Sequence, residues 1–341
     1  MTINEIKEMI KTKPYDFLRT NQHLGKNIIL LGLGGSYSYG TNNEDSDVDV
    51  RGVALNSKEE ILLARPFEQV LDNTTDTVIY SFTKFVKLLA DANPNILEML
   101  FLEPEHYLYL SPIGQELINK RDIFLSKKVL YTFGGYARAQ LSRLDNKTMR
   151  NLDQPGQELH ILRSIQNATH TYHEKYFKFP DDAIKLYIDD SEREDMQSEI
   201  FMDVNFKHYP LRDYKCMWSE MHNIVKDYGR IGKRAKSALR RDIGKHAMHL
   251  VRLQVSAIQM LTEGTMNTCR KKEHDFLMDI RNGKYTDENN QMTDEFFKIV
   301  DELEQKMNDA AEKSSLPNKP NFKAIDQFVC EVNEKIVCGK I

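Results

Sequence analysis

Two aspartates separated by one residue are the side chains in this sequence best suited to chemistry. Asp47 and Asp49 belong to the segment 47–54, where polar and apolar residues alternate as in a strand. Side chains two apart on a strand point to one face, so these carboxylates would lie about 6–7 Å apart and repel each other. A hard divalent cation is the usual neutraliser, and Mg²⁺ prefers carboxylate oxygens. The pair therefore predicts a magnesium site.

Gly35 and Ser36 add the features that a phosphate group needs. They follow the apolar run 27–33, which predicts a buried strand that leads into a tight turn. Glycine lets the backbone approach an anion, N–H groups at a helix start bind phosphate oxygens, and the serine hydroxyl adds a donor. Either motif alone also arises by chance in exposed strands and loops. Their combination favours a site where magnesium bridges carboxylates and phosphates.

The segment Leu33 to Gly52 resembles the signature of the DNA polymerase beta nucleotidyltransferase superfamily: a Gly-Ser, a spacer, and then Asp-hydrophobic-Asp-hydrophobic. More narrowly, it is similar to a bacterial and phage branch of predicted nucleotidyltransferases. The resemblance implies Mg²⁺-dependent transfer of a nucleoside monophosphate from a nucleoside triphosphate, with ATP expected, to an acceptor. It spans roughly residues 28–285, and three further stretches fit it: 93–100, 245–253 and 279–284.

The resemblance also assigns roles to individual residues. Gly35 and Ser36 would contact the triphosphate, while Asp47 and Asp49 would hold two Mg²⁺ ions, for which Mn²⁺ could substitute. The superfamily commonly adds a third carboxylate from a later strand, and Asp76 is our choice, as metal ligand or as base for the acceptor hydroxyl. Asp76 could equally be a plain turn residue. Two rivals for the third position are Asp72 and Glu98, and Glu98, in an apolar helix, could equally cap or pair inside the fold.

The acceptor stays open at this level: an RNA 3′ end, a protein hydroxyl or a small molecule would each suit the superfamily. A toxin-like enzyme that modifies tRNA or a protein would share the chemistry. The alternative from another class is a non-catalytic, nucleotide-binding regulatory protein on the same fold. The intact pair Asp47 and Asp49 argues against it, because idle neighbouring carboxylates cost stability.

The pattern along the chain predicts an α+β fold, with a small mixed-sheet nucleotidyltransferase domain at 1–110 and a mostly helical domain at 111–341 that completes the nucleotide and acceptor cleft. Strands are expected at 27–33, 47–54, 67–71 and 76–80, and helices at 57–64, 82–91 and 95–102. The later helices are expected at 111–119, 126–145, 156–176, 211–229, 233–263, 270–281 and 292–313. The acidic segment 189–199 is expected to be an exposed connection.

The segment 244–263 is mostly apolar, with one polar stripe. At about 100° per residue, Lys245, His249 and Arg252 share this stripe with Ser256 and Gln259. One interpretation places the stripe in the cleft, where Lys245 and Arg252 neutralise phosphates and His249 hydrogen-bonds the nucleotide or acceptor. The alternative is a solvated stripe on the protein surface.

Overall charge limits the partners. The net charge of −4 disfavours a long duplex substrate, although the basic run 226–245 could follow an RNA acceptor or be a solvated helix face. No run approaches the roughly 20 apolar residues that cross a bilayer, so no membrane partner is expected. Four cysteines without metal-site spacing and no signal-peptide pattern predict a cytoplasmic protein.

Overall fold

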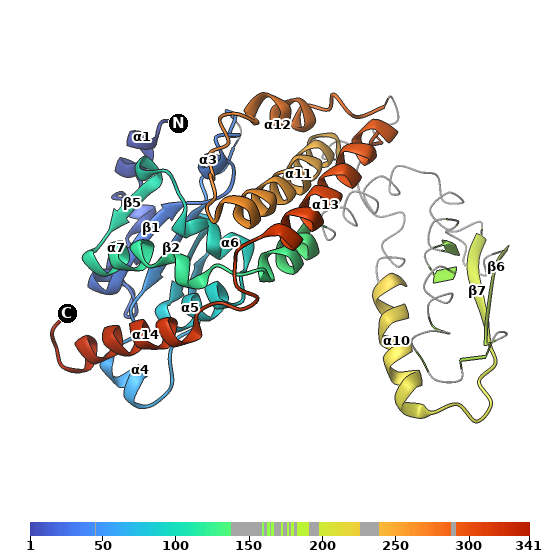
Figure 1. Ribbon diagram of the computed structural model, residues 1–341, viewed down its shortest axis with the longest axis horizontal. Coiled ribbons are helices and arrows are strands. Elements are labelled where there is room, and N and C mark those ends of the chain that lie inside the picture. The colour runs from blue at the N-terminus through green and yellow to red at the C-terminus, as the bar shows by residue number, and fades with distance from the viewer. Residues whose placement is uncertain are drawn as a thin grey trace. The chain divides into compact units, whose positions relative to one another are not determined.

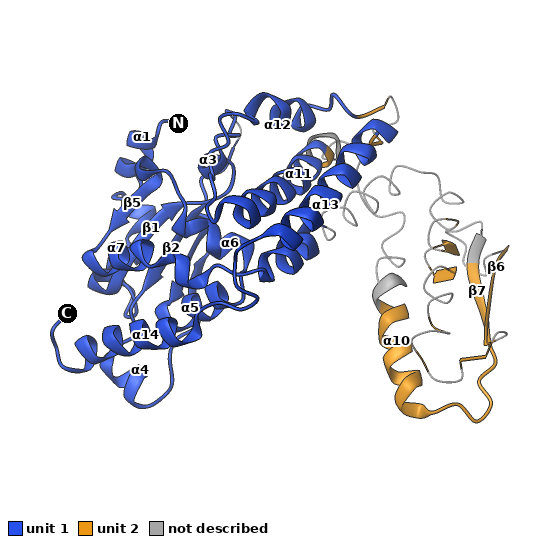
Figure 2. Ribbon diagram, viewed as in Figure 1, with its two compact units in different colours: residues 1–141, 244–285, 293–341 blue, residues 142–243, 286–292 orange. Residues whose placement is uncertain are grey.

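The chain forms two compact units, which Figure 2 colours separately. Unit 1 comprises Met1–Leu141, Gly244–Tyr285 and Thr293–Ile341, and unit 2 comprises Ser142–Ile243 and Thr286–Met292. The computed structural model describes residues 1–44, 46–137, 159, 162–163, 165–166, 172, 176, 179–180, 183–190, 198–225, 239–287 and 291–341.

This division does not coincide with the expected boundary at residue 110. Two segments of the expected helical domain, Gly244–Tyr285 and Thr293–Ile341, belong to the unit that holds the N-terminal sheet. Apolar side chains on these segments, among them Leu250, Val251 and Phe328, are buried in unit 1. The sheet therefore acquires its helical cover from distant parts of the chain.

A five-stranded mixed sheet forms the centre of unit 1 (Figure 1). Its strand order is β3-β4-β2-β1-β5; β2 and β4 run parallel, and the other pairs are antiparallel. The sheet together with its many helices confirms the predicted α+β class. The strands are β1 Ile28–Leu33, β2 Val50–Ala54, β3 Gln69–Asp72, β4 Thr77–Ser81 and β5 Tyr107–Leu110.

The first predicted strand is confirmed, while the second begins later than predicted. All six residues of β1 are buried, as a continuous apolar run on a central strand should be. We expected a strand over 47–54, but β2 begins at Val50, and residues 46–49 are irregular. Residues 47–49 therefore continue the alternating sequence pattern of the strand, but they precede the strand and do not belong to it.

Short helices surround the sheet. The N-terminal ones bring Tyr15 and Leu18 onto Ile28 and Ile79. Those before residue 111 are α1 Ile3–Met9, η1 Lys13–Tyr15, α2 Phe17–Thr20, η2 Gly25–Asn27, α3 Gly35–Tyr39, α4 Lys58–Leu62, α5 Phe82–Ala90, α6 Pro94–Leu97, η3 Glu98–Leu100 and η4 Pro104–His106. Those that follow in unit 1 are α7 Pro112–Asn119, η5 Arg121–Phe124, α12 His274–Arg281, α13 Asp294–Lys313 and α14 Phe322–Val337. The predicted helices in these places are present, with shifted ends.

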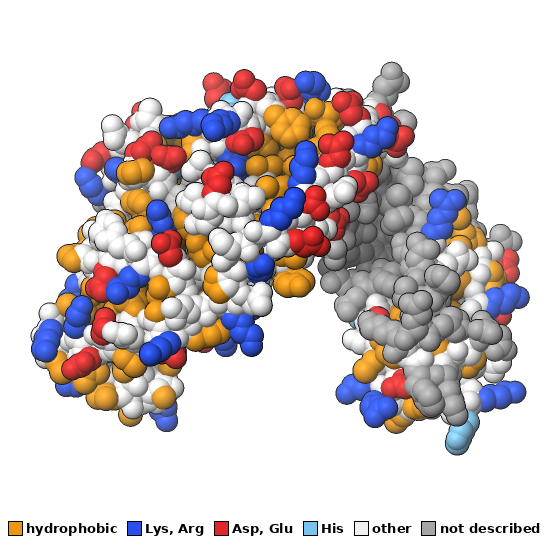
Figure 3. All heavy atoms as spheres, viewed as in Figure 1, with side chains coloured by type: hydrophobic (Ala, Val, Ile, Leu, Met, Phe, Trp, Pro, Cys, Tyr) orange, Lys and Arg blue, Asp and Glu red, His pale blue; other side chains and the backbone are white. Residues whose placement is uncertain are grey.

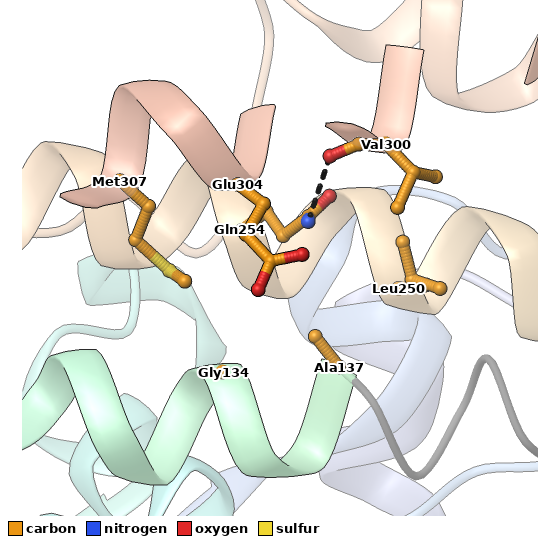
Figure 4. Close-up of a pocket in the computed structure, with 7 residues that line it drawn as sticks. All are labelled: Gly134, Ala137, Leu250, Gln254, Val300, Glu304 and Met307. Carbon is orange, nitrogen blue, oxygen red and sulfur yellow. Dashed lines mark hydrogen bonds between the residues drawn. The ribbon is translucent and has the colours of Figure 1, made fainter. Parts of the chain in front are cut away.

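The longest helix, α11 Leu239–Glu263, lies beside α13 in Figure 1. Between them and the helical residues 128–137 is a small, mostly apolar hollow (Figure 4). The amide nitrogen of Gln254 donates to the carbonyl of Val300 across it, at 3.1 Å. Its lining residues are Gly134, Ala137, Leu250, Gln254, Val300, Glu304 and Met307, none of which is a predicted site residue.

Unit 2 contains a hairpin that the sequence interpretation missed. Strands β6 Ile184–Asp190 and β7 Ser198–Val204 pair antiparallel. We expected 189–199 to be an exposed connection, yet residues at both of its ends belong to these strands. The alternation of Ile184, Leu186 and Ile188 with polar residues was the available signal, and the neighbouring acidic residues obscured it.

Helix α10 Leu211–Val225 also lies in unit 2. Its Met217 and Met221 join Tyr172, Tyr176 and Phe179 in an apolar cluster. Of the helices in the described parts of both units, none is long and apolar enough to cross a membrane.

Candidate functional site

The turn from β1 into α3 is built on glycine. Gly35 has φ +56°, a left-handed conformation that side chains other than glycine rarely adopt. The N–H of Gly34 donates to the carbonyl of Asp49 at 2.9 Å, which ties the turn to the residue before β2. The N–H groups at the start of α3 have no partner within the helix. Half-buried Ser36 is among these first residues, as the sequence predicted.

Asp49 lies directly against this turn. A Cβ atom placed on Gly35 would stand 2.0 Å from Oδ2 of Asp49, so only glycine leaves room for the carboxylate. The other oxygen, Oδ1, accepts a hydrogen bond from Arg51 at 3.1 Å. The structure therefore brings together the carboxylate and the glycine turn.

Asp76 lies beside Asp49, where the neighbouring strands β4 and β2 begin. Val50 pairs with Thr77 in the parallel β2–β4 ladder, so Asp49 and Asp76 immediately precede two paired residues. The carbonyl of Asp76 accepts from the N–H of Val50 at 3.2 Å, and its side chain is exposed. A third carboxylate, on the residue before a later strand, therefore lies close enough to influence Asp49, and its role as metal ligand or base stays a prediction.

The rival Asp72 is engaged elsewhere. One of its carboxylate oxygens, Oδ1, accepts hydrogen bonds from the backbone and hydroxyl groups of both Thr74 and Thr75. These bonds stabilise the turn between β3 and β4 and lower the pKa of Asp72. Asp76, at the other end of this turn, is the acid whose charge acts on Asp49, and it stays our choice for the third acid.

Electrostatics link Asp49 to four charged neighbours. Burial raises the pKa of Asp49, Arg51 opposes this, Asp76 raises it further, Lys245 opposes, and Asp47 raises it again. Exposed Asp47 and exposed Lys245 are therefore both close enough to influence the same carboxylate. A half-buried carboxylate with two acidic neighbours is a place where a cation would relieve repulsion.

The carboxylates of this site suit a Mg²⁺ ion that is bound partly by the protein and partly by the substrate. In the described part of the chain, no three acidic, histidine or cysteine side chains lie close enough to enclose a metal ion by themselves. Mg²⁺ usually takes one or two protein carboxylates, and its remaining ligands are waters and substrate phosphates. Asp49 beside the Gly35 turn, with the charge of Asp47 near it, fits such an open, substrate-completed arrangement.

The polar stripe of α11 faces the interior of unit 1. Arg252 and Ser256 are buried, and Arg270 donates to Ser256 Oγ and to Gln259 Oε1, each at 3.1 Å. The alternative of a solvated stripe is therefore wrong over Arg252 and Ser256. Lys245, at the start of the stripe, is the exposed member.

Arg252 forms a buried pair with Glu98, a partner that the sequence interpretation did not identify. Its guanidinium donates to Glu98, and it lies 3.6 Å from the ring centroid of Tyr39. The hydroxyl of Tyr39 donates to the same carboxylate at 2.7 Å. The positive charge of Arg252, which we expected to neutralise phosphates, is therefore paired with Glu98 inside the protein. The same pair engages Glu98, the other rival for the third acid. Tyr39 ends α3, so the triad of these three side chains anchors the helix that Gly35 begins.

His249 lies at the edge of this triad. Its ring meets Tyr39 edge-on, with centroids 6.0 Å apart. Burial is the main reason why the pKa of His249 lies well below its ordinary value, and the positive charges of Arg252 and Lys245 add to this. The imidazole is therefore neutral at neutral pH, when it can donate or accept a hydrogen bond.

The lowered pKa of His249 gives a stability prediction. Below about pH 6.5 the unfolded chain protonates this histidine while the folded protein does not, so its contribution to stability falls as the pH drops toward the folded pKa. We expect His249→Gln to flatten the fall in Tm between pH 7 and pH 5. Thermal unfolding followed by circular dichroism measures it, with the half-buried His274→Gln as control. Parallel curves for wild type and His249→Gln would contradict it.

Two further contacts hold the ends of α3 and α11. Arg281 donates to the carbonyl of Thr41 just after α3, and Gly244 packs so closely on Arg281 that a Cβ would stand 2.2 Å from its carbonyl oxygen. The basic run 226–245 lies mostly outside the described residues, because 226–238 are not among them. Its proposed RNA contact is therefore untested.

Comparison with known proteins shows the family to which this chain belongs. The family model described as "RlaP: RNA repair pathway DNA polymerase beta family" matches residues 6–331, nearly the whole chain. An uncharacterized 38.9 kDa protein in the nrdC-mobD intergenic region of Enterobacteria phage T4 is 26% identical over 162 residues. That alignment covers 44% of this chain and 46% of the phage protein, so the chain spans about half the length of this relative. No solved structure matches. The chain belongs to the RNA repair pathway DNA polymerase beta family, whose superfamily indicates a nucleotidyltransferase-like function.

Proposed function

We propose that this protein is a Mg²⁺-dependent nucleotidyltransferase that transfers a nucleoside monophosphate from a nucleoside triphosphate to a hydroxyl of RNA. The observation that carries the proposal is the Asp49 carboxylate against the Gly35 turn, with Asp47 and Asp76 as acidic neighbours. The RNA acceptor is favoured by the description of the family to which the chain belongs.

In this proposal the start of α3 binds the triphosphate. The N–H groups of Gly35 and Ser36 and the Ser36 hydroxyl donate to phosphate oxygens, because backbone N–H groups at a helix start have no partner within the helix. Lys245 adds a positive charge on the side of Asp49. His249, neutral and half-buried, lies next to Tyr39 and supplies a hydrogen-bonding group near the nucleotide. Arg252 acts indirectly, because its guanidinium packs on the ring of Tyr39 and so fixes the end of α3.

Asp47 and Asp49 would hold the metal, with Asp76 as a third ligand or as the base for the acceptor hydroxyl. Bound Mg²⁺, or Mn²⁺ in its place, would act as a Lewis acid on the phosphates and the acceptor oxygen. The acceptor oxygen forms a bond to the α-phosphorus as the bond to the β-phosphate oxygen breaks. Pyrophosphate leaves, and the proton of the hydroxyl passes to the base.

The test is transfer of label from α-labelled ATP, CTP, GTP and UTP, each with Mg²⁺, to RNA and protein fractions of a cell extract. We expect labelled RNA, with ATP as the preferred donor, and loss of labelling in Asp47→Asn, which removes a metal-binding charge. The matched control is Glu44→Gln, which neutralises another exposed carboxylate in the same loop and should label normally.

Equal labelling by wild type and Asp47→Asn would overturn the catalytic proposal. The non-catalytic alternative predicts a different pattern: the protein would bind triphosphate, and no fraction would become labelled. Labelled protein in place of labelled RNA would keep the chemistry and overturn the acceptor.

A further inference from the structure

We propose that the exposed face of α10 in unit 2 binds single-stranded RNA, with Trp218 as a platform on which a base stacks. This inference rests on the proposed function, since it names a surface for the RNA acceptor. It does not require Mg²⁺ or a triphosphate, so it can be tested separately from transfer.

The face is a continuous stripe along the helix. Leu211, Lys215, Trp218 and His222 are all exposed, and their spacings of four, three and four residues put them on one side of an α-helix. Leu211 is 78% exposed and Trp218 49%. Large exposed side chains along one stripe mark a surface for an interaction partner.

Trp218 is held in a defined orientation by its neighbours. Its ring stacks on Tyr214, with centroids 6.2 Å apart and planes inclined by 23°. Tyr214 in turn meets Phe206 edge-on at 5.7 Å, and Phe206 lies against Phe179 of the apolar cluster. The exposed indole is thus supported by the interior of the unit, as a stacking platform for bases should be.

The basic side chains of α10 and of the loop before it suit a polyanion. Lys215, Arg212, Lys207 and His208 are exposed, and the Arg212 side chain is 88% exposed although its Nε lies 3.4 Å from Oδ1 of Asp213. In Figure 3, Lys, Arg and His side chains stand at the lower end of unit 2, where the chain passes from β7 into α10.

Both carboxylates in the described part of α10 are withdrawn from this face. The Asp213 side chain is only 14% exposed, and Glu220 accepts a hydrogen bond from the hydroxyl of Tyr176 in the apolar cluster. The exposed stripe therefore combines positive charge with an aromatic ring and keeps negative charge away. Grooves that bind single strands have this combination, because phosphates need cations and bases need a π-face.

Trp218 is the single tryptophan of the chain, so its fluorescence reports directly on the proposed contact. Titration of the full-length protein with a single-stranded 12-nucleotide RNA of mixed sequence, without triphosphate or Mg²⁺, is expected to quench the emission. With a dye-labelled copy of this RNA, anisotropy should show that Trp218→Ala weakens binding by about 5- to 100-fold, as expected for one stacked base.

Three variants sharpen the test. Trp218→Phe keeps a stacking ring and should retain most of the affinity, which separates loss of stacking from misfolding. Lys215→Gln should reduce the dependence of affinity on salt concentration, because one phosphate contact is lost. Tyr131→Ala removes another strongly exposed aromatic ring, in unit 1, and should bind RNA normally.

Unquenched emission during RNA binding, or equal RNA affinity in Trp218→Ala and wild type, would overturn the inference. A protein bound at Trp218 in place of RNA would do the same. These failures are distinguishable from failure of the proposed function, because Asp47→Asn should abolish transfer while it leaves RNA binding and quenching intact. If labelling is intact and quenching is absent, only the α10 surface is refuted.

Discussion

Gly35→Ala is expected to lower the rate of nucleotide transfer by at least about a hundredfold. The added methyl group would displace the Asp49 carboxylate, and misplacement of a reacting group by about 1 Å costs roughly this much in rate. The Cβ would stand 2.0 Å from Asp49 Oδ2, well inside contact distance. Gly35 also has a left-handed backbone, so alanine adds a cost of roughly 1–2 kcal/mol in stability. Initial rates of label transfer at saturating triphosphate measure the effect.

The chain offers a matched control for this variant. Gly264 follows α11 with φ +66°, and a Cβ there would meet nothing within 4 Å. Gly264→Ala therefore carries a similar backbone cost without the clash, and it should lose stability but keep its transfer rate. If both variants transfer at the wild-type rate, Asp49 and the Gly35 turn do not form one site.

Glu98→Ala is expected to destabilise unit 1 by about 3–5 kcal/mol, because it leaves the buried guanidinium of Arg252 without its counter-charge. Glu98 and Arg252 are both almost fully buried, and Tyr39 would lose its acceptor as well. Urea unfolding followed by circular dichroism measures the change. The control Asp91→Ala breaks the solvent-exposed pair with Lys128 and should cost no more than about 1 kcal/mol.

A double variant separates the lost pair from the lost packing. Glu98→Leu combined with Arg252→Met replaces both charges with apolar groups and should recover much of the stability that Glu98→Ala loses. Full stability of Glu98→Ala alone would show that the pair does not hold α3 and α11 together. A double variant as unstable as Glu98→Ala would show that packing around Tyr39, and not charge, is decisive.

The part of the site that could be predicted is local in sequence. The apolar run of β1, Gly35-Ser36 and Asp47 to Asp49 lie within about two dozen residues, and each motif carries its own chemical reason. The structure places these motifs together, although β2 begins only at Val50. The alternating pattern alone could not show that residues 47–49 precede the strand instead of forming part of it.

The pairing of Arg252 with Glu98 could not be predicted, because the two residues are 154 positions apart. The helical stripe showed correctly that Arg252 needs polar surroundings, but not which surroundings those would be. A buried charge requires a partner, and a search for unclaimed acidic residues in apolar segments would have raised Glu98 as the candidate. Tyr39, inside the Gly-Ser motif, carried no separate signal.

The division into units escaped prediction for a similar reason. Segments far apart in sequence join the sheet of unit 1, and composition does not reveal which helices return to it. The β6–β7 hairpin was hidden because its acidic residues suggested a connection. Only the period-two pattern of its apolar residues pointed to strands.

The most direct test of the account is a crystal structure of the protein with a non-hydrolysable triphosphate and Mn²⁺, whose anomalous scattering locates the metal. We predict the phosphates at the N–H groups of the Gly35–Ser36 turn and the metal between these phosphates and the carboxylates of Asp47 and Asp49. A triphosphate bound elsewhere, or a metal that touches neither aspartate, would contradict the proposed chemistry.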